Sequence, residues 1–280
     1  MVRTGTSRAV IEFDDGCVDE AFATLMREAP GAEVYPARDF RLEWGPVFHR
    51  GRLDGSARVL VIGQDPAAHE AIARRILVGE AGQRVQAFLA HLGLHRSYVL
   101  VNAFLYSVYG QQGGQLHASD PAVAAYRHRW FQAILSTAPI EAVVAFGRLA
   151  DTAWQIWRTT GGPGGELPYA ALPHPTQPES SSGGDPVKLA AAYRRMLARW
   201  NEGLTALHPV LTSADEPGPL ILFDEGARPE TARVPAADLP AGCPAWMGGL
   251  ESWASREGDD VEEKRATIVV RVPTGERPWH

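Results

Sequence analysis

The chain has 280 residues, of which 45% are hydrophobic and 21% charged, so it can bury a substantial core as one globular domain with an appendage. Its formal net charge is −6, but residues 209–280 hold 13 acidic and 7 basic residues, so the rest of the chain is balanced and charge does not exclude a basic groove there. The two cysteines, Cys17 and Cys243, are too few for a zinc finger or a four-cysteine iron–sulfur cluster, and we expect neither a metal nor a cofactor.

No stretch of the chain has the character of a membrane or export segment. No apolar run approaches the ~18 residues that a helix needs to span a bilayer. Residues 1–9 lack the apolar core of a secretion signal. We therefore expect a cytoplasmic protein with no membrane partner.

Four short apolar runs are typical of buried parallel strands, because each ends in a polar or turn residue. They lie at residues 58–62, 97–102, 141–146 and 169–173. Helical patterns occur at residues 80–92, 120–136, 148–157 and 185–207, with loops expected at residues 160–168 and 177–185. Strands that alternate with helices predict a three-layer α/β/α fold around a central, mostly parallel sheet of four strands.

The amino-acid composition of the chain changes after residue 208. Residues 209–280 are rich in proline and glycine and contain one further strand candidate at residues 267–272. Residues 220–223 and 268–272 are too apolar for a free linker. We therefore predict an α/β domain over residues 1–208 and a C-terminal extension, residues 209–280, packed on its core.

Polar residues follow the first, second and fourth predicted strands. The first strand runs into Gly63-Gln64-Asp65-Pro66, where glycine permits a tight turn and proline ends the strand pairing. The second strand ends at Asn102, and the fourth is followed by His174-Pro175-Thr176. Since ligands bind at the carboxyl edge of open parallel sheets, we expect Asp65, Asn102 and His174 to converge there.

The chemistry available to this set is narrow. It has one carboxylate, one amide and one imidazole, and no serine or cysteine nucleophile paired with a base. The chain also lacks a glycine-rich loop with the spacing of a dinucleotide or P-loop motif. These patterns argue against acyl transfer and against a phosphate-binding loop of either kind.

In order and spacing, the motifs resemble the uracil-DNA glycosylase superfamily. The resemblance rests on Gly63–Pro66, on the strand ending at Asn102, on His174–Thr176, and on Gly-Glu-Ala-Gly within residues 75–82. It covers roughly residues 33–206 and leaves out the extension. It implies a DNA glycosylase that hydrolyses the N-glycosidic bond of deoxyuridine, releases uracil and leaves an abasic site, without metal or cofactor.

The resemblance also implies roles for individual residues. Asp65 would stabilise the oxocarbenium-like sugar and orient the attacking water. His174 would donate a hydrogen bond to O2 of the departing uracil, with the backbone N–H of Gln64 as a second donor beside Gly63. The Asn102 amide can accept from uracil N3–H and donate to O4, which distinguishes uracil from cytosine.

Two positions depart from the superfamily pattern. Ala67 stands where a bulky tyrosine commonly excludes thymine, and Leu77 stands where the base usually stacks on an aromatic ring. Phe104 or Tyr106 could take over the stacking. A wider pocket could then admit other deaminated or mismatched bases.

The target base must leave the DNA helix, which requires contacts to the backbone and a side chain to fill the gap. The loop after the histidine motif has no bulky apolar residue, so Gln177 is the candidate for the gap. The candidate contacts to DNA phosphates are Arg74, Arg75, Thr176, Ser180, Ser181, Ser182, Lys188 and Arg194. The expected partner is uracil-containing DNA, single- or double-stranded, and the expected state is a monomer.

Three alternatives stay open on the sequence. The first is a glycosylase for another base, such as mismatched thymine or hypoxanthine, which Ala67 motivates. The second is a module that holds damaged or abasic DNA with little turnover, which Leu77 and the unusual loop motivate. The third is an α/β protein that binds a free nucleotide.

Overall fold

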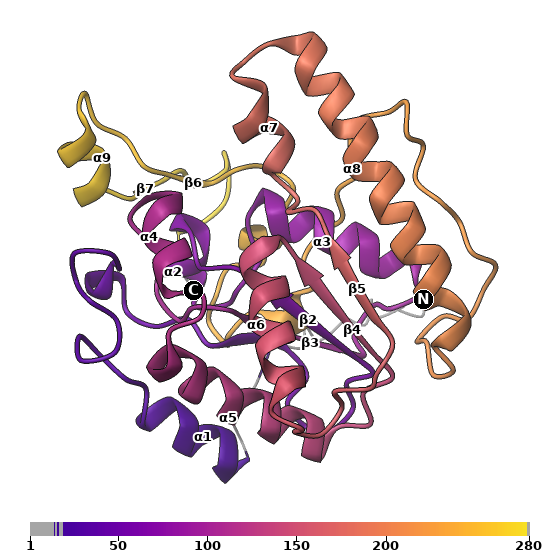
Figure 1. Cartoon of the computed structure of the whole chain (residues 1–280). Helices are drawn as coiled ribbons and strands as arrows, with labels where there is room; N and C mark the ends of the chain where they lie inside the picture. The colour runs from indigo at the N-terminus through magenta and orange to yellow at the C-terminus, as the bar shows by residue number, and fades with distance from the viewer. Residues whose placement is uncertain (1–13, 15, 17–18, 279–280) are drawn as a thin grey trace, which may run out of the picture.

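The computed structural model describes residues 14, 16 and 19–278, which form an α/β fold around a five-stranded sheet (Figure 1). The strands are β1 (His49–Gly51), β2 (Val59–Gly63), β3 (Tyr98–Asn102), β4 (Ala142–Phe146) and β5 (Tyr169–Leu172), in the spatial order β1-β3-β2-β4-β5. Strands β2 to β5 are parallel, whereas β1 pairs antiparallel with β3. The predicted mostly parallel α/β/α fold is confirmed.

The predicted count of four strands is corrected to five, because no pattern in the sequence indicates β1. This strand has three residues, too few for an apolar run or an alternating pattern to be seen. It ends at Gly51, whose φ is +89°. A Cβ at Gly51 would come within 2.3 Å of the Tyr98 carbonyl oxygen, so only glycine lets the strand end this close to β3.

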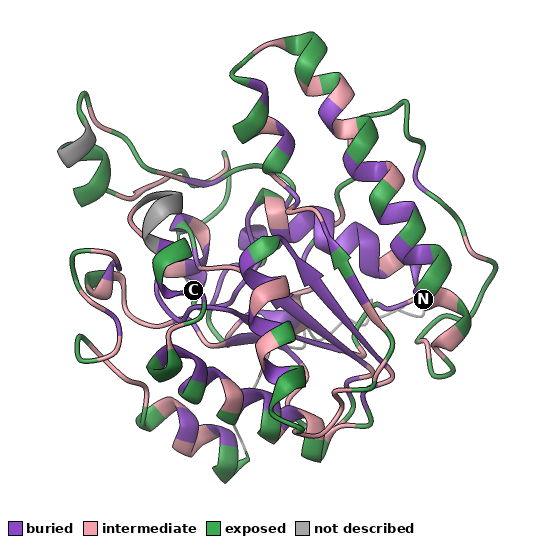
Figure 2. Ribbon diagram, viewed as in Figure 1, coloured by how far each residue is buried: buried purple, intermediate pink, exposed green. Residues whose placement is uncertain are grey.

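Alternate residues of the central strands enter two separate cores. Leu60 and Ile62 of β2 join the core formed with α1, α5 and α6, while Val59 and Val61 join the core formed with α3 and α8. Every residue of β2, β3 and β4 is buried, as the uniformly purple strands of Figure 2 show. This arrangement fixes the three layers and aims the carboxyl ends of the parallel strands at one edge.

The helices are α1 (Glu20–Arg27), α2 (Ala68–Ala73), α3 (Glu80–His91), α4 (Gly110–His117), α5 (Pro121–Thr137), α6 (Arg148–Thr159), α7 (Gln177–Ser182), α8 (Pro186–Leu207) and α9 (Val261–Ala266). The predicted helices correspond to α3, α5, α6 and α8. Asp120 and Asp185 cap α5 and α8 by accepting from backbone N–H groups two residues on, both at 2.9 Å. Short 3₁₀ turns occur at Leu42–Trp44, His208–Val210, Ala236–Asp238 and Ala245–Gly248.

The loop predicted over residues 177–185 is also corrected, because its first part forms α7. This six-residue helix has Pro178 in its first turn, and Gly183 follows it in a left-handed conformation with a φ of +60°. Its serine-rich sequence has low helix propensity, so the helix depends on its packing against α8. The segment after His174 is therefore a short helix that forms part of the cavity wall, and not the irregular loop that the sequence predicts.

The C-terminal extension packs on the α/β domain and builds a third apolar cluster with it. Trp246, Met247 and Trp253 meet Ala68 and Val78 in this cluster. The extension then forms a small antiparallel pair, β6 (Ala254–Ser255) and β7 (Val269–Val270), with α9 between the two strands. The strand predicted over residues 267–272 is therefore shorter than expected.

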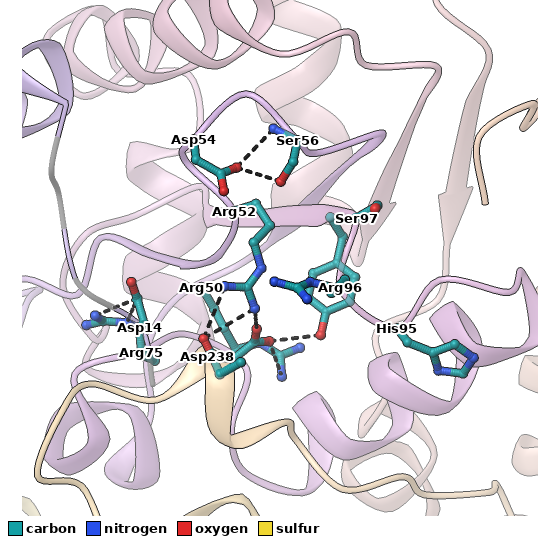
Figure 3. Close-up of polar contacts among 12 residues, drawn as sticks. Asp14, Arg50, Arg52, Asp54, Ser56, Arg75, His95, Arg96, Ser97 and Asp238 are labelled. Carbon is teal, nitrogen blue, oxygen red and sulfur yellow. Dashed lines mark hydrogen bonds and ion pairs between the residues drawn. The ribbon is translucent and has the colours of Figure 1, made fainter. Parts of the chain in front are cut away.

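Buried charges fasten the extension to the sheet (Figure 3). Asp238, which is fully buried, accepts hydrogen bonds from Arg52 Nη2 at 2.8 Å and from the Tyr98 hydroxyl at 2.9 Å. Arg50 Nη1 lies 3.7 Å from the same carboxylate. The extension thus supplies the counter-charge for Arg50, within β1, and for Arg52, directly after it. The boundary at residues 208 and 209 stays a prediction.

The cysteines, the helices and possible metal ligands can be checked only within the residues that the structure describes. Cys243 is a free, buried thiol, and Cys17 lies outside the described residues. Within the described part, none of the helices is both long enough and apolar enough to cross a bilayer. These residues also contain no cluster of three or more histidine, cysteine, aspartate or glutamate side chains that could hold a metal ion.

Candidate active site

A large cavity opens at the carboxyl ends of the parallel strands. Its volume is about 1240 Å³, and it is lined by the segments after β2, β4 and β5, by α2 and α7, and by part of the C-terminal extension. Asp65 and His174 both line it. The cavity is therefore where the sheet topology predicts a ligand site.

Asp65 has an environment that opposes its negative charge. The side chain is half-buried, and its Oδ2 accepts one hydrogen bond from the Val108 N–H at 3.2 Å. Burial raises the pKa of Asp65 to about 7, and the nearby Glu70 charge raises it further, while the Val108 hydrogen bond and the Arg256 charge oppose the rise. A carboxyl that changes protonation near neutral pH in a cavity is a candidate reacting group.

Glu70 of α2 ties together two loops that form the cavity. Its Oε2 accepts from the Ala67 N–H at 3.0 Å, and its Oε1 accepts from the Val78 and Gly79 N–H groups at 2.9 and 3.1 Å. The side chain is buried, so these bonds satisfy a carboxylate that would otherwise be costly there. Glu70 therefore holds the loop after Asp65 against the loop that contains Leu77.

His174 is oriented by the residue two positions later. Its Nδ1 accepts from the Thr176 N–H at 3.3 Å and lies 3.2 Å from the Thr176 hydroxyl. Burial lowers the pKa of His174 to about 4, with the Arg84 charge adding to the fall and Glu179 opposing it. The ring is thus neutral at pH 7, and an Nδ1 that accepts assigns the proton to Nε2.

Arg84 of α3 holds the segment that carries His174. Its Nη1 donates to the Pro175 carbonyl at 2.6 Å, and its Nη2 donates to Glu179 of α7 at 2.6 Å. Arg84 is buried, and its guanidinium also lies 5.5 Å from the centre of the Tyr193 ring. The buried guanidinium of Arg84 therefore holds the His174 segment and α7 in place.

Gly147, directly after β4, lets two site residues pack against its backbone. Its φ is +96°, and a Cβ there would lie 2.6 Å from Gln64 Oε1 and 3.1 Å from His174 Cβ. Gln64 Oε1 also accepts from the Leu149 N–H at 3.2 Å, at the start of α6. The glycine is required twice, for its backbone conformation and for this close contact.

Asn102 lies beside Gly63, with which it is paired in the sheet. A Cβ at Gly63 would come within 2.3 Å of Asn102 Oδ1 and 3.3 Å of Leu77 Cδ1. Asn102 Oδ1 is buried and has no hydrogen-bond partner within the described chain. It is not among the residues that line the cavity, but its unpaired acceptor is adjacent to the wall formed by Leu77.

The comparison with known families agrees with this geometry. The model of the uracil DNA glycosylase superfamily matches residues 50–194, just over half of the chain. The chain belongs to this superfamily. No curated protein is significantly similar to it. The matched segment runs from β1 into α8 and includes Asp65, Asn102 and His174.

Most of the contacts predicted from the resemblance to the uracil DNA glycosylase superfamily lie on the cavity. Gln64, Ala67, Leu77, Thr176, Gln177, Ser180 and Ser181 all line the cavity together with Asp65 and His174. Ala67 is exposed on the cavity. Leu77 is in a left-handed conformation with a φ of +53°, held by the close approach of Gly82 to its carbonyl.

The two aromatic residues proposed for base stacking lie elsewhere. Phe104 is fully buried and packs edge-on against Phe40, with ring centres 5.4 Å apart. The Tyr106 hydroxyl donates to the Pro30 carbonyl at 3.0 Å, and its ring contacts Tyr35. Neither ring lines the cavity, because the chain turns them into the core after β3. This placement does not fit the predicted stacking.

Several predicted phosphate contacts are already engaged within the protein. Arg75 is buried and its Nη2 pairs with Asp14 at 2.7 Å (Figure 3). Arg74 Nη1 donates to the Trp44 carbonyl at 2.7 Å, and Ser182 is buried. These positions do not fit contacts to DNA. Lys188 is exposed and lies 3.8 Å from Asp185, and Arg194 is exposed on α8.

The sequence interpretation missed several residues that line the cavity. They are Trp44, His69, Gln115, Arg148, Ser252 and Arg256. Arg148 follows Gly147 at the end of a predicted strand, so its place at the carboxyl edge could have been found. Ser252 and Arg256 come from the extension, and no local sequence pattern indicates that this segment returns to the cavity.

Proposed function

We propose that this protein removes uracil from DNA by hydrolysis of the N-glycosidic bond, without metal or cofactor, and leaves an abasic site. The single observation that carries the proposal is that Asp65 and His174 line the same cavity, the imidazole in its neutral form. Membership of the superfamily supports a DNA glycosylase for uracil or another damaged base. The choice of uracil rests on Asn102, whose unpaired acceptor lies behind the Leu77 wall of the cavity.

In the proposed reaction, charge separates between the sugar and the base. The bond between C1′ and the base nitrogen breaks, and its electron pair leaves with the base. The Asp65 carboxylate stabilises the cationic sugar and accepts a proton from the water that attacks C1′. The Nε2–H of His174 donates to the anionic O2 of the leaving uracil. Abasic DNA and uracil are the products.

Asn102 supports uracil as the base in this scheme. Its buried Oδ1 lacks a partner, and such an acceptor is costly unless a ligand satisfies it. Uracil N3–H is a donor of the required kind, whereas cytosine N3 is an acceptor. An amide oxygen presented to the base would therefore favour uracil over cytosine.

The direct test uses a labelled oligonucleotide with one uracil, incubated with the protein and then with alkali. We expect strand cleavage at the uracil, because an abasic site is labile to alkali, and no cleavage of a matched oligonucleotide with cytosine there. An intact uracil strand at high protein concentration would contradict the proposal. Cleavage before alkali treatment would contradict simple hydrolysis.

A second candidate is a glycosylase with a wider choice of bases, and Ala67 is the observation that favours it. This exposed residue lines a cavity of about 1240 Å³ without filling it. Base release from duplexes with uracil, mismatched thymine or hypoxanthine would separate the two candidates. If the wider choice is right, Ala67→Tyr should suppress thymine release and spare uracil release.

The remaining expectations concern the setting of the reaction. We propose that the partner is DNA and that the protein acts on it as a monomer in the cytoplasm. The large exposed apolar side chains within the described residues are few, and only Ile221 and Leu222 are neighbours in the chain, which supports a monomer. Sedimentation analysis that gave a dimer mass at micromolar concentration would contradict this expectation.

A further inference from the structure

The C-terminal extension reaches the cavity through one segment, residues 252–271, which we name the strap. Its first part packs on α2: the Ala254 N–H donates to His69 Nε2 at 3.1 Å, and Ser252 Oγ lies 3.3 Å from the same nitrogen. Burial lowers the pKa of His69, which keeps this ring neutral and able to accept. The strap is therefore fixed to the helix that follows Asp65.

The strap is fixed a second time near the cavity-lining Trp44. The Arg265 carbonyl accepts from Arg41 Nη1 at 2.7 Å. Arg41 is buried, and its guanidinium lies 4.6 Å from the centre of the Trp44 ring and 4.2 Å from that of Tyr109. Two separate anchors thus hold the strap, whose β6 packs against α2; Figure 1 draws β6, α9 and β7 in yellow.

Between these anchors the strap places Arg256 on the cavity. Arg256 is exposed, lines the cavity, and makes no hydrogen bond or ion pair within the described chain. Its charge lies close enough to Asp65 to lower the pKa of that carboxyl. By contrast, Arg271 on the same strap is engaged with Glu257 and with Ser255 Oγ, and it does not line the cavity.

Among the described residues, Arg256 and Arg148 are the two arginines that line the cavity, where a cation favours bound DNA. The acidic residues that line the cavity are Asp65, Glu70 and Glu80, and they repel a phosphate backbone. A nucleotide that enters the cavity brings its own phosphates to the rim. An exposed guanidinium suits this contact, because its planar donors match two phosphate oxygens at once.

We propose that Arg256 binds a backbone phosphate of the nucleotide held in the cavity, so that the strap is part of the DNA-binding site. This inference rests on the proposed function for its choice of ligand. It assigns to the extension a role that the superfamily match, which ends at residue 194, does not cover.

The test measures binding separately from base release. The probe is a fluorescent duplex with a tetrahydrofuran abasic analogue, titrated with the full chain at several salt concentrations. We expect Arg256→Gln to weaken binding ~5- to 20-fold and to reduce the slope of log K against log salt by about 0.9, the value for one phosphate contact. Arg256→Lys should recover part of the affinity.

Arg271→Gln is the matched control, since it removes an arginine from the same strap away from the cavity. It should leave both affinity and salt slope unchanged. The inference is overturned if Arg256→Gln binds like the wild type, or if Arg271→Gln loses as much. It is also overturned if Arg256→Gln changes only the pH dependence of base release, which would limit Arg256 to an electrostatic effect on Asp65.

The two proposals can fail separately. If the wild type releases uracil but Arg256→Gln binds normally, the strap inference fails and the proposed function stands. If no base is released, while Arg256→Gln still lowers affinity and salt slope, the phosphate contact stands and hydrolysis is wrong.

Discussion

At the residue scale, the cavity contains two groups whose protonation is displaced in complementary directions. Burial raises the pKa of Asp65 to about 7 and lowers that of His174 to about 4. At neutral pH the carboxyl is therefore partly charged, while the imidazole is neutral. Displaced acid and base groups that share one cavity are typical of reacting pairs.

The ionised form of Asp65 should lower the stability of the fold while it supports base release. Its folded-state pKa lies above the ordinary value of 3.8, so the fold loses stability as pH rises from about 4 to about 7. Asparagine resembles the protonated form and avoids this loss. Asp65→Asn should abolish base release yet raise the free energy of unfolding at pH 8 by on the order of 1–3 kcal/mol. Urea unfolding at pH 4.5 and pH 8 measures this. A variant less stable than wild type at pH 8 would contradict it.

His174 should contribute to the rate rather than to DNA affinity. Loss of one hydrogen-bond donor to a developing anion typically lowers a rate ~10²- to 10³-fold. We expect His174→Ala to show that loss in single-turnover base release, with its affinity for abasic-analogue DNA within about twofold of wild type. Equal losses in rate and affinity would instead make His174 a binding residue.

The residues most visible in the sequence were those that end strands. Asp65, Asn102 and His174 each follow an apolar run, so strand topology alone predicts that they share one edge of the sheet. The roles of Glu70 and Arg84 could not be predicted, because they come from hydrogen bonds to backbone groups that no local sequence pattern indicates. The stacking roles of Phe104 and Tyr106 did not fit, since an aromatic residue after a strand can turn into the core as readily as into a cavity.

At the element scale, the His174 segment depends on α3 and α7. Arg84→Met removes the donors to Pro175 and Glu179 while keeping much of the side-chain length. We expect base release to slow ~10- to 100-fold through misplacement of His174, with KM little changed. Kinetics of Arg84→Met beside the surface control Arg199→Met provide the measurement. A rate within twofold of wild type would show that the loop holds its own shape.

The sequence predicted the long helices with a clear hydrophobic period, but it did not predict the short helix α7 or the short strand β1. The Asp-Pro pairs correctly located the starts of α5 and α8. Helix α7 and strand β1 were missed because tertiary contacts stabilise segments whose local pattern is weak. The correction matters for function, since α7 brings Gln177, Ser180 and Ser181 to the cavity as an ordered surface.

At the scale of the whole molecule, the extension and the α/β domain should unfold together. Asp238 is buried against Arg50, Arg52 and Tyr98, so its removal leaves buried charges without a partner. Asp238→Asn should lower the free energy of unfolding by about 3–5 kcal/mol. The exposed pair Arg199–Glu202 provides a control, and Glu202→Gln should cost less than about 1 kcal/mol.

Thermal unfolding followed by far-UV circular dichroism and by tryptophan fluorescence tests this coupling. Of the eight tryptophans, Trp246 and Trp253 lie in the apolar cluster of the extension, so its unfolding contributes to the fluorescence change. The two signals should share one transition in the wild type and in Asp238→Asn. Separate transitions would contradict a single cooperative unit. The sequence indicated that the extension packs on the core, but not that a buried aspartate anchors it.

The pH dependence of single-turnover uracil release tests the central claim most directly, because it reports both displaced groups at once. We expect the rate to rise with pH through about 7 as Asp65 loses its proton, and then to stay level to pH 9. We expect no second inflection between pH 5 and 7, because His174 is already neutral there. A rate that falls with rising pH in this range, or that keeps the same rise in Asp65→Asn, would contradict the proposed roles of both residues.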